Sequence, residues 1–146
     1  MKFVHYSDKK FRLNKKKKYE QSLDHKPFGF WLSSENVDTS WELWCKREGF
    51  NLKGLRVKKY YKVDMIKLLQ IHNEDEMYKF VNEYGTSLYG TSLKSCVIDW
   101  KKVSSKYCGI YIPYNYKLRF EYSFYYGWDV DSVCIWDLSV LNKKGR

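Results

Sequence analysis

The sequence contains no alanine, only two prolines and no long apolar run, and these absences narrow what the chain can be. No stretch approaches the roughly 18 apolar residues that a membrane span requires, and no apolar core of a signal peptide is visible. We therefore expect a protein without a membrane partner that works in the cytoplasm.

The common signatures of metal, nucleotide and nucleophile sites are also missing. The four cysteines are at least 12 residues apart, without a CxxC pair, and the three histidines are scattered, so we expect reduced thiols and no metal site. Neither GxGxxG nor GxxxxGK[ST] occurs, which argues against a Rossmann or P-loop nucleotide site. GxSxG is absent as well, which argues against the nucleophile of an α/β-hydrolase.

What the sequence does have is aromatic residues and positive charge. Aromatics make up 19% of the 146 residues, a length that predicts a single domain over 1–146 with a substantial core. The net charge of +10 predicts a surface that attracts anions, such as nucleic acid, nucleotides, phosphorylated partners or acidic lipids. Charge alone does not choose among them.

The hydrophobic pattern alternates between strands and short helices without a regular βαβ order, which predicts an α+β fold. Residues 2–6 and the apolar run 28–34 read as strands, separated by a basic connection over 9–26. Thr39 or Ser40 can cap a helix that ends near Gly49, with Trp41, Trp44 and Cys45 on one face. Further along we expect these elements: a strand over most of 58–71, a helix at 74–85, a mobile loop at 84–95 that contains YGTSL twice, a helix within 98–109, a strand at GIYIPY, and two β-rich runs around Gly127.

Three aspartates near the C-terminus are candidates for acid chemistry. Asp129, Asp131 and Asp137 surround the run SVCIW, and two tryptophans neighbour them. An acid beside indoles at a strand edge can have a shifted pKa or orient a sugar hydroxyl. The alternative is that GWDVD is a polar turn between strands.

His5 and the lysine run are each open to two interpretations. His5 lies in an apolar strand, where a histidine is usually a hydrogen-bonded structural residue. The run KKFRLNKKKK at 9–18 contains Lys15, Lys16, Lys17 and Lys18, which either form a solvated loop or contact phosphates of a nucleic acid.

The order of these pieces resembles the ADP-ribosyltransferase fold, in its diphtheria-toxin and poly(ADP-ribose) polymerase branch. FVHYS stands where that family has a strand ending in His-Gly-[Ser/Thr], GFWLSS where it has Gly-[Ile/Leu]-Tyr-Phe-[Ala/Ser], and an acid precedes the late strand. The resemblance implies two small, mostly antiparallel sheets with short flanking helices and a pocket for NAD between them.

The resemblance also implies roles for individual residues. His5 matches the histidine that hydrogen-bonds the adenosine-side ribose of NAD, and Ser7 the Ser/Thr of that motif. Tyr6 replaces a glycine whose backbone approaches nicotinamide. In the second motif, which Gly29 begins and Ser33 ends, Trp31 takes the place of the tyrosine that packs on nicotinamide. Asp129 or Asp131 occupies the region of the catalytic glutamate.

The function implied is transfer of ADP-ribose from NAD, as substrate and without a metal, to a protein or nucleic acid acceptor. Two alternatives stand beside it: a non-catalytic, basic and aromatic binding protein for nucleic acid or a nucleotide, and an RNA 2′-phosphate-processing enzyme of related fold. The chain also looks like a poorly characterised group of phage, viral and microbial proteins with HYS, KPxGLWxS and WDV…CIW elements. That likeness implies the host cytoplasm if the chain is viral.

Overall fold

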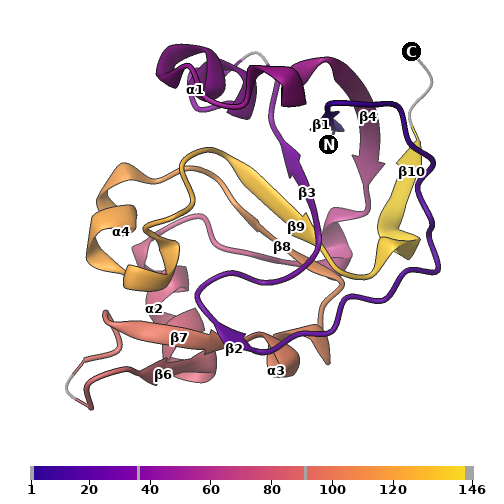
Figure 1. The fold of residues 1–146 in the computed structure, drawn as a ribbon. Coiled ribbons are helices and arrows are strands. Elements are labelled where there is room, and N and C mark those ends of the chain that lie inside the picture. Colours follow the sequence, from indigo (N-terminus) through magenta and orange to yellow (C-terminus); the bar gives the residue numbers. More distant parts are fainter. Residues whose placement is uncertain (1, 36, 91, 144–146) are drawn as a thin grey trace.

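The computed structural model describes residues 2–35, 37–90 and 92–143 and shows a mixed α+β architecture built on a curled seven-stranded sheet (Figure 1). The large sheet has the strand order β10-β4-β1-β3-β9-β8-β5, and a smaller sheet has the order β2-β7-β6. Every strand pair is antiparallel except β5 with β8. The strands are β1 (Lys2–Ser7), β2 (Leu23–Asp24), β3 (Phe30–Ser33), β4 (Val57–Val63), β5 (Leu68–Gln70), β6 (Gly85–Ser87), β7 (Cys96–Asp99), β8 (Gly109–Ile112), β9 (Ser132–Ile135) and β10 (Leu141–Lys143).

Four α-helices flank the sheets, and each begins at a capping side chain of the kind that satisfies free backbone N–H groups. Ser40, Asn73, Asp99 and Asn115 accept from the backbone N–H three residues on. The helices are α1 (Trp41–Glu48), α2 (Glu74–Tyr84), α3 (Trp100–Ser104) and α4 (Tyr116–Glu121).

Two hydrophobic clusters lie on opposite faces of the large sheet. One contains Trp100, Trp128 and Phe80 and joins the sheet to α2, α3, α4 and the small sheet. The other contains Phe3, Phe30 and residues of β4, β9 and β10. Strand alternation explains the division, because successive side chains of β1, β3 and β9 point to opposite faces.

Several predicted elements are confirmed, and four predictions were wrong in extent or type. The strand over 58–71 is two strands, β4 and β5, separated by a 3-10 turn at Met65–Lys67 and lying far apart in the sheet. The first copy of YGTSL contributes β6, which pairs with β7, so the segment 84–95 is partly strand; residue 91 lies outside the described residues.

The other two errors concern the C-terminal third and the sheets. The aromatic run before Gly127 is not a strand, because Asn115 caps helix α4 and a 3-10 turn at Ser123–Tyr125 follows. The two sheets are unequal, with seven and three strands, rather than two small ones. Aromatic residues are frequent in strands, so the run before Gly127 looks like a strand in the sequence. The capping residue Asn115 nevertheless starts a helix there.

Candidate functional site

Strands β1, β3 and β9 lie side by side and bring distant segments to one face of the sheet. Val4 pairs with Ser33 across β1 and β3, and Ser33 pairs with Ser132 across β3 and β9. Because paired residues point to the same face, Trp31 and Ser33 share a face with Val4 and Ser132.

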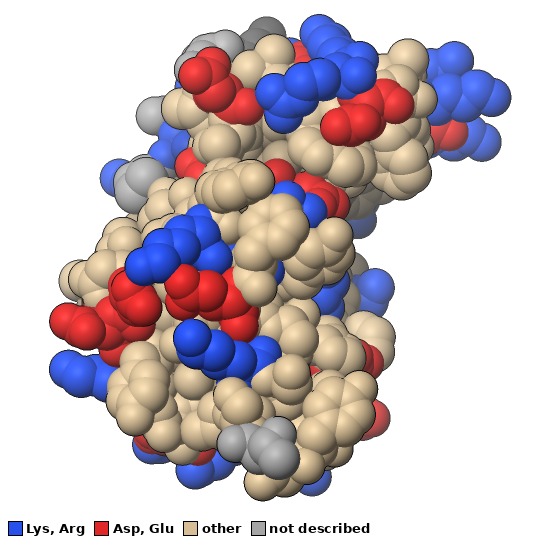
Figure 2. Space-filling model, turned by 90° about the vertical axis from the view of Figure 1, so that its left-hand side faces the viewer, with Lys and Arg blue, Asp and Glu red and all other residues tan. Residues whose placement is uncertain are grey.

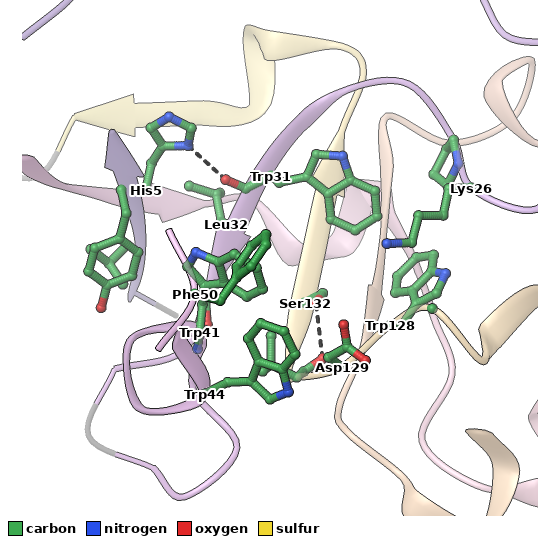
Figure 3. Close-up of a pocket in the computed structure, with 16 residues that line it drawn as sticks. His5, Lys26, Trp31, Leu32, Trp41, Trp44, Phe50, Trp128, Asp129 and Ser132 are labelled. Atoms are coloured by element: carbon green, nitrogen blue, oxygen red, sulfur yellow. Dashed lines mark hydrogen bonds between the residues drawn. The ribbon is translucent and has the colours of Figure 1, made fainter. Parts of the chain in front are cut away.

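On this face lies a cavity of about 500 Å³, between the sheet, α1 and the segment that follows α4 (Figure 3). Its volume is within the range of roughly 300–1,000 Å³ that is typical of small-molecule sites. It is lined by Val4, His5, Tyr6, Lys26, Pro27, Trp31, Leu32, Ser33, Trp41, Trp44, Phe50, Gly127, Trp128, Asp129, Val130 and Ser132.

Aromatic rings form most of the cavity wall. Trp41 and Trp44 stack with ring centroids 5.2 Å apart, and Phe50 meets Trp44 edge-on at 5.6 Å. The sequence folds this way because Gly49 ends α1 in the left-handed conformation, at φ 64°, which returns Phe50 toward the helix. Trp31 meets Trp128 edge-on at 5.0 Å on the sheet side of the cavity.

One carboxylate and one ammonium group give the cavity its polarity. Asp129 lies at the wall, and Arg119 of α4 holds it with a 2.6 Å charged hydrogen bond. Lys26 has its Nζ 5.6 Å from the centre of the Trp31 ring. Burial lowers the pKa of Lys26, and the nearby Asp129 acts in the opposite direction. Gly127 allows this placement, since a Cβ there would lie 3.2 Å from the Lys26 Cε.

Two lining residues carry buried polar atoms without a protein partner. Among the described residues, neither the Tyr6 hydroxyl nor the Trp128 indole N–H has a hydrogen-bond partner. Burial and the nearby Glu42 and Glu35 carboxylates raise the pKa of Tyr6, so its hydroxyl keeps its proton. Buried groups of this kind are usually satisfied. Both atoms have almost no accessible surface, so a ligand in the cavity could reach them only if neighbouring side chains moved.

The His5 ring lies on the other face of the sheet from this aromatic wall. It stacks on Phe30 at 4.1 Å, and its Nδ1 lies 2.8 Å from the Trp31 carbonyl oxygen. Burial lowers the pKa of His5, and the Lys59 ammonium acts in the same direction. The residue borders the cavity, but its ring points away from Trp41, Trp44 and Asp129 (Figure 3).

Two further predicted residues lie outside the cavity lining. The Ser7 hydroxyl donates to the Lys9 carbonyl at 2.9 Å. Gly29 lies against β9, where a Cβ would be 2.5 Å from the Cys134 Sγ and 2.7 Å from the Ile135 carbonyl oxygen. Gly29 therefore sets the distance between two strands of the site rather than lining it.

Asp131 also differs in position from Asp129. Its carboxylate accepts hydrogen bonds from the Ser34 and Thr39 hydroxyls, at 3.1 and 3.2 Å, and from the Tyr114 backbone N–H. Asp131 thereby ties together three segments around the site and is not among the lining residues. Of the two candidate acids, only Asp129 lines the cavity.

We predict that Asp131→Ala lowers the free energy of unfolding by about 2 kcal/mol, because it leaves several donors unpaired, one of them a backbone N–H. Urea denaturation measures this loss. Glu83→Ala, at an exposed ion pair, is the control and should leave stability close to that of the wild type. Wild-type stability of Asp131→Ala would contradict the structural role.

The lysine run lies away from the cavity. Lys15 donates from its Nζ to the Leu141 carbonyl of β10 at 2.5 Å, and Lys17 lies over the Tyr19 ring at 4.9 Å. None of Lys15, Lys16, Lys17 and Lys18 lines the cavity.

Comparisons of the chain with protein-family models, curated proteins and solved structures find no match. Within the described residues, no group of three His, Cys, Asp or Glu side chains is placed to hold a metal ion. In the same part of the chain, no helix has the length and apolar character needed to span a bilayer.

The arrangement suits a flat ring attached to a charged or hydroxylated group. Indole and phenyl faces favour aromatic and cationic rings, Lys26 favours an anion, and Asp129 favours hydroxyls or developing positive charge. Sequence reasoning did not assign Lys26, Arg119 or Phe50 to the site. It interpreted Trp41 and Trp44 as one helix face, and their spacing is the only signal that pointed to the wall they form.

Proposed function

We propose that the cavity binds NAD and that the chain transfers ADP-ribose from it to a macromolecular acceptor. The observation that carries the proposal is the convergence of Tyr6, Trp31, Ser33 and Asp129 on one cavity. These residues come from three separate segments. The resemblance to ADP-ribosyltransferases implies one site for Tyr6, Trp31, Ser33 and either Asp129 or Asp131.

The chemistry of NAD matches the lining. The nicotinamide ring carries a positive charge while it is attached to ribose, which favours the faces of Trp31, Trp41 and Trp44. The pyrophosphate suits the ammonium of Lys26 at the same cavity.

Transfer needs little covalent help from the protein. The bond between the nicotinamide nitrogen and ribose C1′ breaks, and its electron pair leaves with nicotinamide. The positive charge that develops on the ribose is stabilised by the Asp129 carboxylate, which Arg119 holds in place. A nucleophilic oxygen or nitrogen of the acceptor then bonds to C1′ and loses its proton.

A second candidate function is non-catalytic binding of a nucleotide in the same cavity. Two observations favour it: the His5 ring stacks on Phe30 away from the aromatic wall, and the Asp129 carboxylate is already paired with Arg119. Both functions require NAD-type binding, and only the first requires release of nicotinamide.

We expect NAD to bind the wild-type chain, and Trp31→Ala to weaken binding by about 1–3 kcal/mol, roughly fivefold to 150-fold in Kd, because a stacking surface is lost. Calorimetric titration measures the affinity, and nicotinamide in the same samples is quantified by chromatography. Tyr78→Ala, at an exposed position on α2, is the control. Binding without release supports the second candidate, and absence of both contradicts the proposal.

A further inference from the structure

The positive charge of the chain is concentrated in two segments. Residues 2–18 and 57–63 contain eleven of the 27 lysines and arginines but only one of the 17 acidic residues. These two segments therefore carry a net charge of +10, equal to that of the whole chain, and the other residues hold 16 charges of each sign. The one acid, Asp8, is paired with Arg56, outside both segments.

The two segments are neighbours in space. They contain β1 and β4, which pair along their whole length, and β10 pairs with the other side of β4. The connection after β1 runs down beside β10 (Figure 1). Lys59 of β4 donates to the Phe11 carbonyl, and Lys15 donates to the Leu141 carbonyl, which fixes the connection against this edge of the sheet.

The pairing of β1 with β4 places like charges opposite one another. Lys2 is the direct cross-strand partner of Lys62, and both side chains are exposed. Like charges opposite one another in a sheet reduce stability. Val4 pairs with Tyr60 in the same ladder, so Lys2, Tyr60 and Lys62 lie on the face of the sheet that bears the cavity.

These cations have few acidic partners. Of the eleven, only Lys58 has a carboxylate oxygen within 4.0 Å among the described residues, those of Glu35 and Glu42. On the face that carries α1 and α4, acidic and basic side chains are mixed (Figure 2). The basic edge, by which we mean the cations of 2–18 and 57–63, therefore differs from that face in its charge.

We propose that the basic edge binds the phosphate backbone of a nucleic acid. Lys2 and Lys62 face one another across β1 and β4, and further cations continue around the edge to the connection at 9–18, where Lys15 lies against Leu141 of β10. A row of this length needs an anion with several phosphates rather than one nucleotide. Lys2, with its Nζ 4.7 Å from the Tyr60 ring centre, begins this row beside the cavity face.

Nucleic acid fits this edge better than an anionic membrane does. The cations occur on both sides of the sheet, because Lys2 and Lys62 lie on one face and the basic connection at 9–18 packs against the other through Phe11 and Leu13. A flexible strand can follow such a curved path, whereas a bilayer presents one plane. The inference does not depend on the proposed NAD chemistry, because binding is measured without NAD.

The test compares Lys2→Gln/Lys62→Gln with the matched control Lys79→Gln/Lys101→Gln, which removes two exposed cations on α2 and α3. Binding of labelled 20-nucleotide single-stranded RNA, single-stranded DNA and duplex DNA is followed by fluorescence anisotropy over a range of salt concentrations. For the single strands we expect the Lys2/Lys62 variant to lower the slope of log affinity against log salt by about 1.4, at ~0.7 per lost phosphate contact. The control should keep the wild-type slope.

Equal losses in both variants would overturn the proposal, since they would reflect net charge alone. Absence of binding to every nucleic acid at low salt would also overturn it. So would binding to vesicles containing phosphatidylserine in preference to nucleic acid. Circular dichroism checks that the Lys2/Lys62 variant remains folded, as expected from the removal of two like charges that face one another.

Discussion

Replacing Asp129 with asparagine is expected to reduce the release of nicotinamide from NAD at least a hundredfold, while NAD affinity changes by only a few fold. The asparagine oxygen can still accept from Arg119, so the geometry of the wall should be retained. In the proposed reaction the substitution removes the negative charge that would lie beside the ribose when positive charge develops there. Electrostatic groups of this kind typically contribute two to three orders of magnitude to a rate.

The control for this prediction is Glu83→Gln, which removes an exposed carboxylate far from the cavity and should leave the rate unchanged. The rate is measured by chromatographic quantification of nicotinamide, and the affinity by calorimetry. Release at the wild-type rate from Asp129→Asn would contradict the assignment of Asp129 as the catalytic acid.

Gly29→Ala is expected to lower the free energy of unfolding by about 3 kcal/mol and to weaken NAD binding as well. The new Cβ would lie 2.7 Å from the Ile135 carbonyl oxygen, and the backbone of β9 cannot rotate away as a side chain can. Strand β3 would have to move away from β9, which carries Trp31 away from Trp128. Overpacking in a well-packed core costs about 1–3 kcal/mol and sometimes more.

Gly127→Ala is the matched control, because its Cβ would approach only the flexible end of Lys26, at 3.2 Å. We expect a change in stability below about 1 kcal/mol. Urea denaturation of the two variants and the wild type gives the comparison. Equal stability of Gly29→Ala and Gly127→Ala would show that the close approach of β3 to β9 does not matter.

The elements that the sequence predicted well are those with strong local signals. Ser40 and Gly49 mark the two ends of α1, and the acidic first turn of α2 marks its start. The aromatic segment before Gly127 has no residue pattern that separates helix from strand, since tyrosine and phenylalanine are frequent in strands and also occur in short helices. The break between β4 and β5 likewise lacks a glycine or proline and depends on how the chain packs.

The order of strands in the sequence was enough to predict that β1, β3 and the segment before β9 contribute to one site. It was not enough to predict which side chains of those strands point into the cavity. His5 and Tyr6 are neighbours on one strand, so their side chains point to opposite faces of the sheet. The structure places the Tyr6 side of β1 toward the cavity. Lys26 and Arg119 join the site from segments 93 residues apart, and no local pattern connects them.

The most direct test of the central claim is a crystal structure of the chain soaked with NAD. We predict that nicotinamide lies against the faces of Trp31, Trp41 and Trp44, with a hydroxyl of the attached ribose within hydrogen-bond distance of the Asp129 carboxylate. NAD bound on another surface, or a cavity that stays without NAD at concentrations that saturate binding in solution, would contradict it.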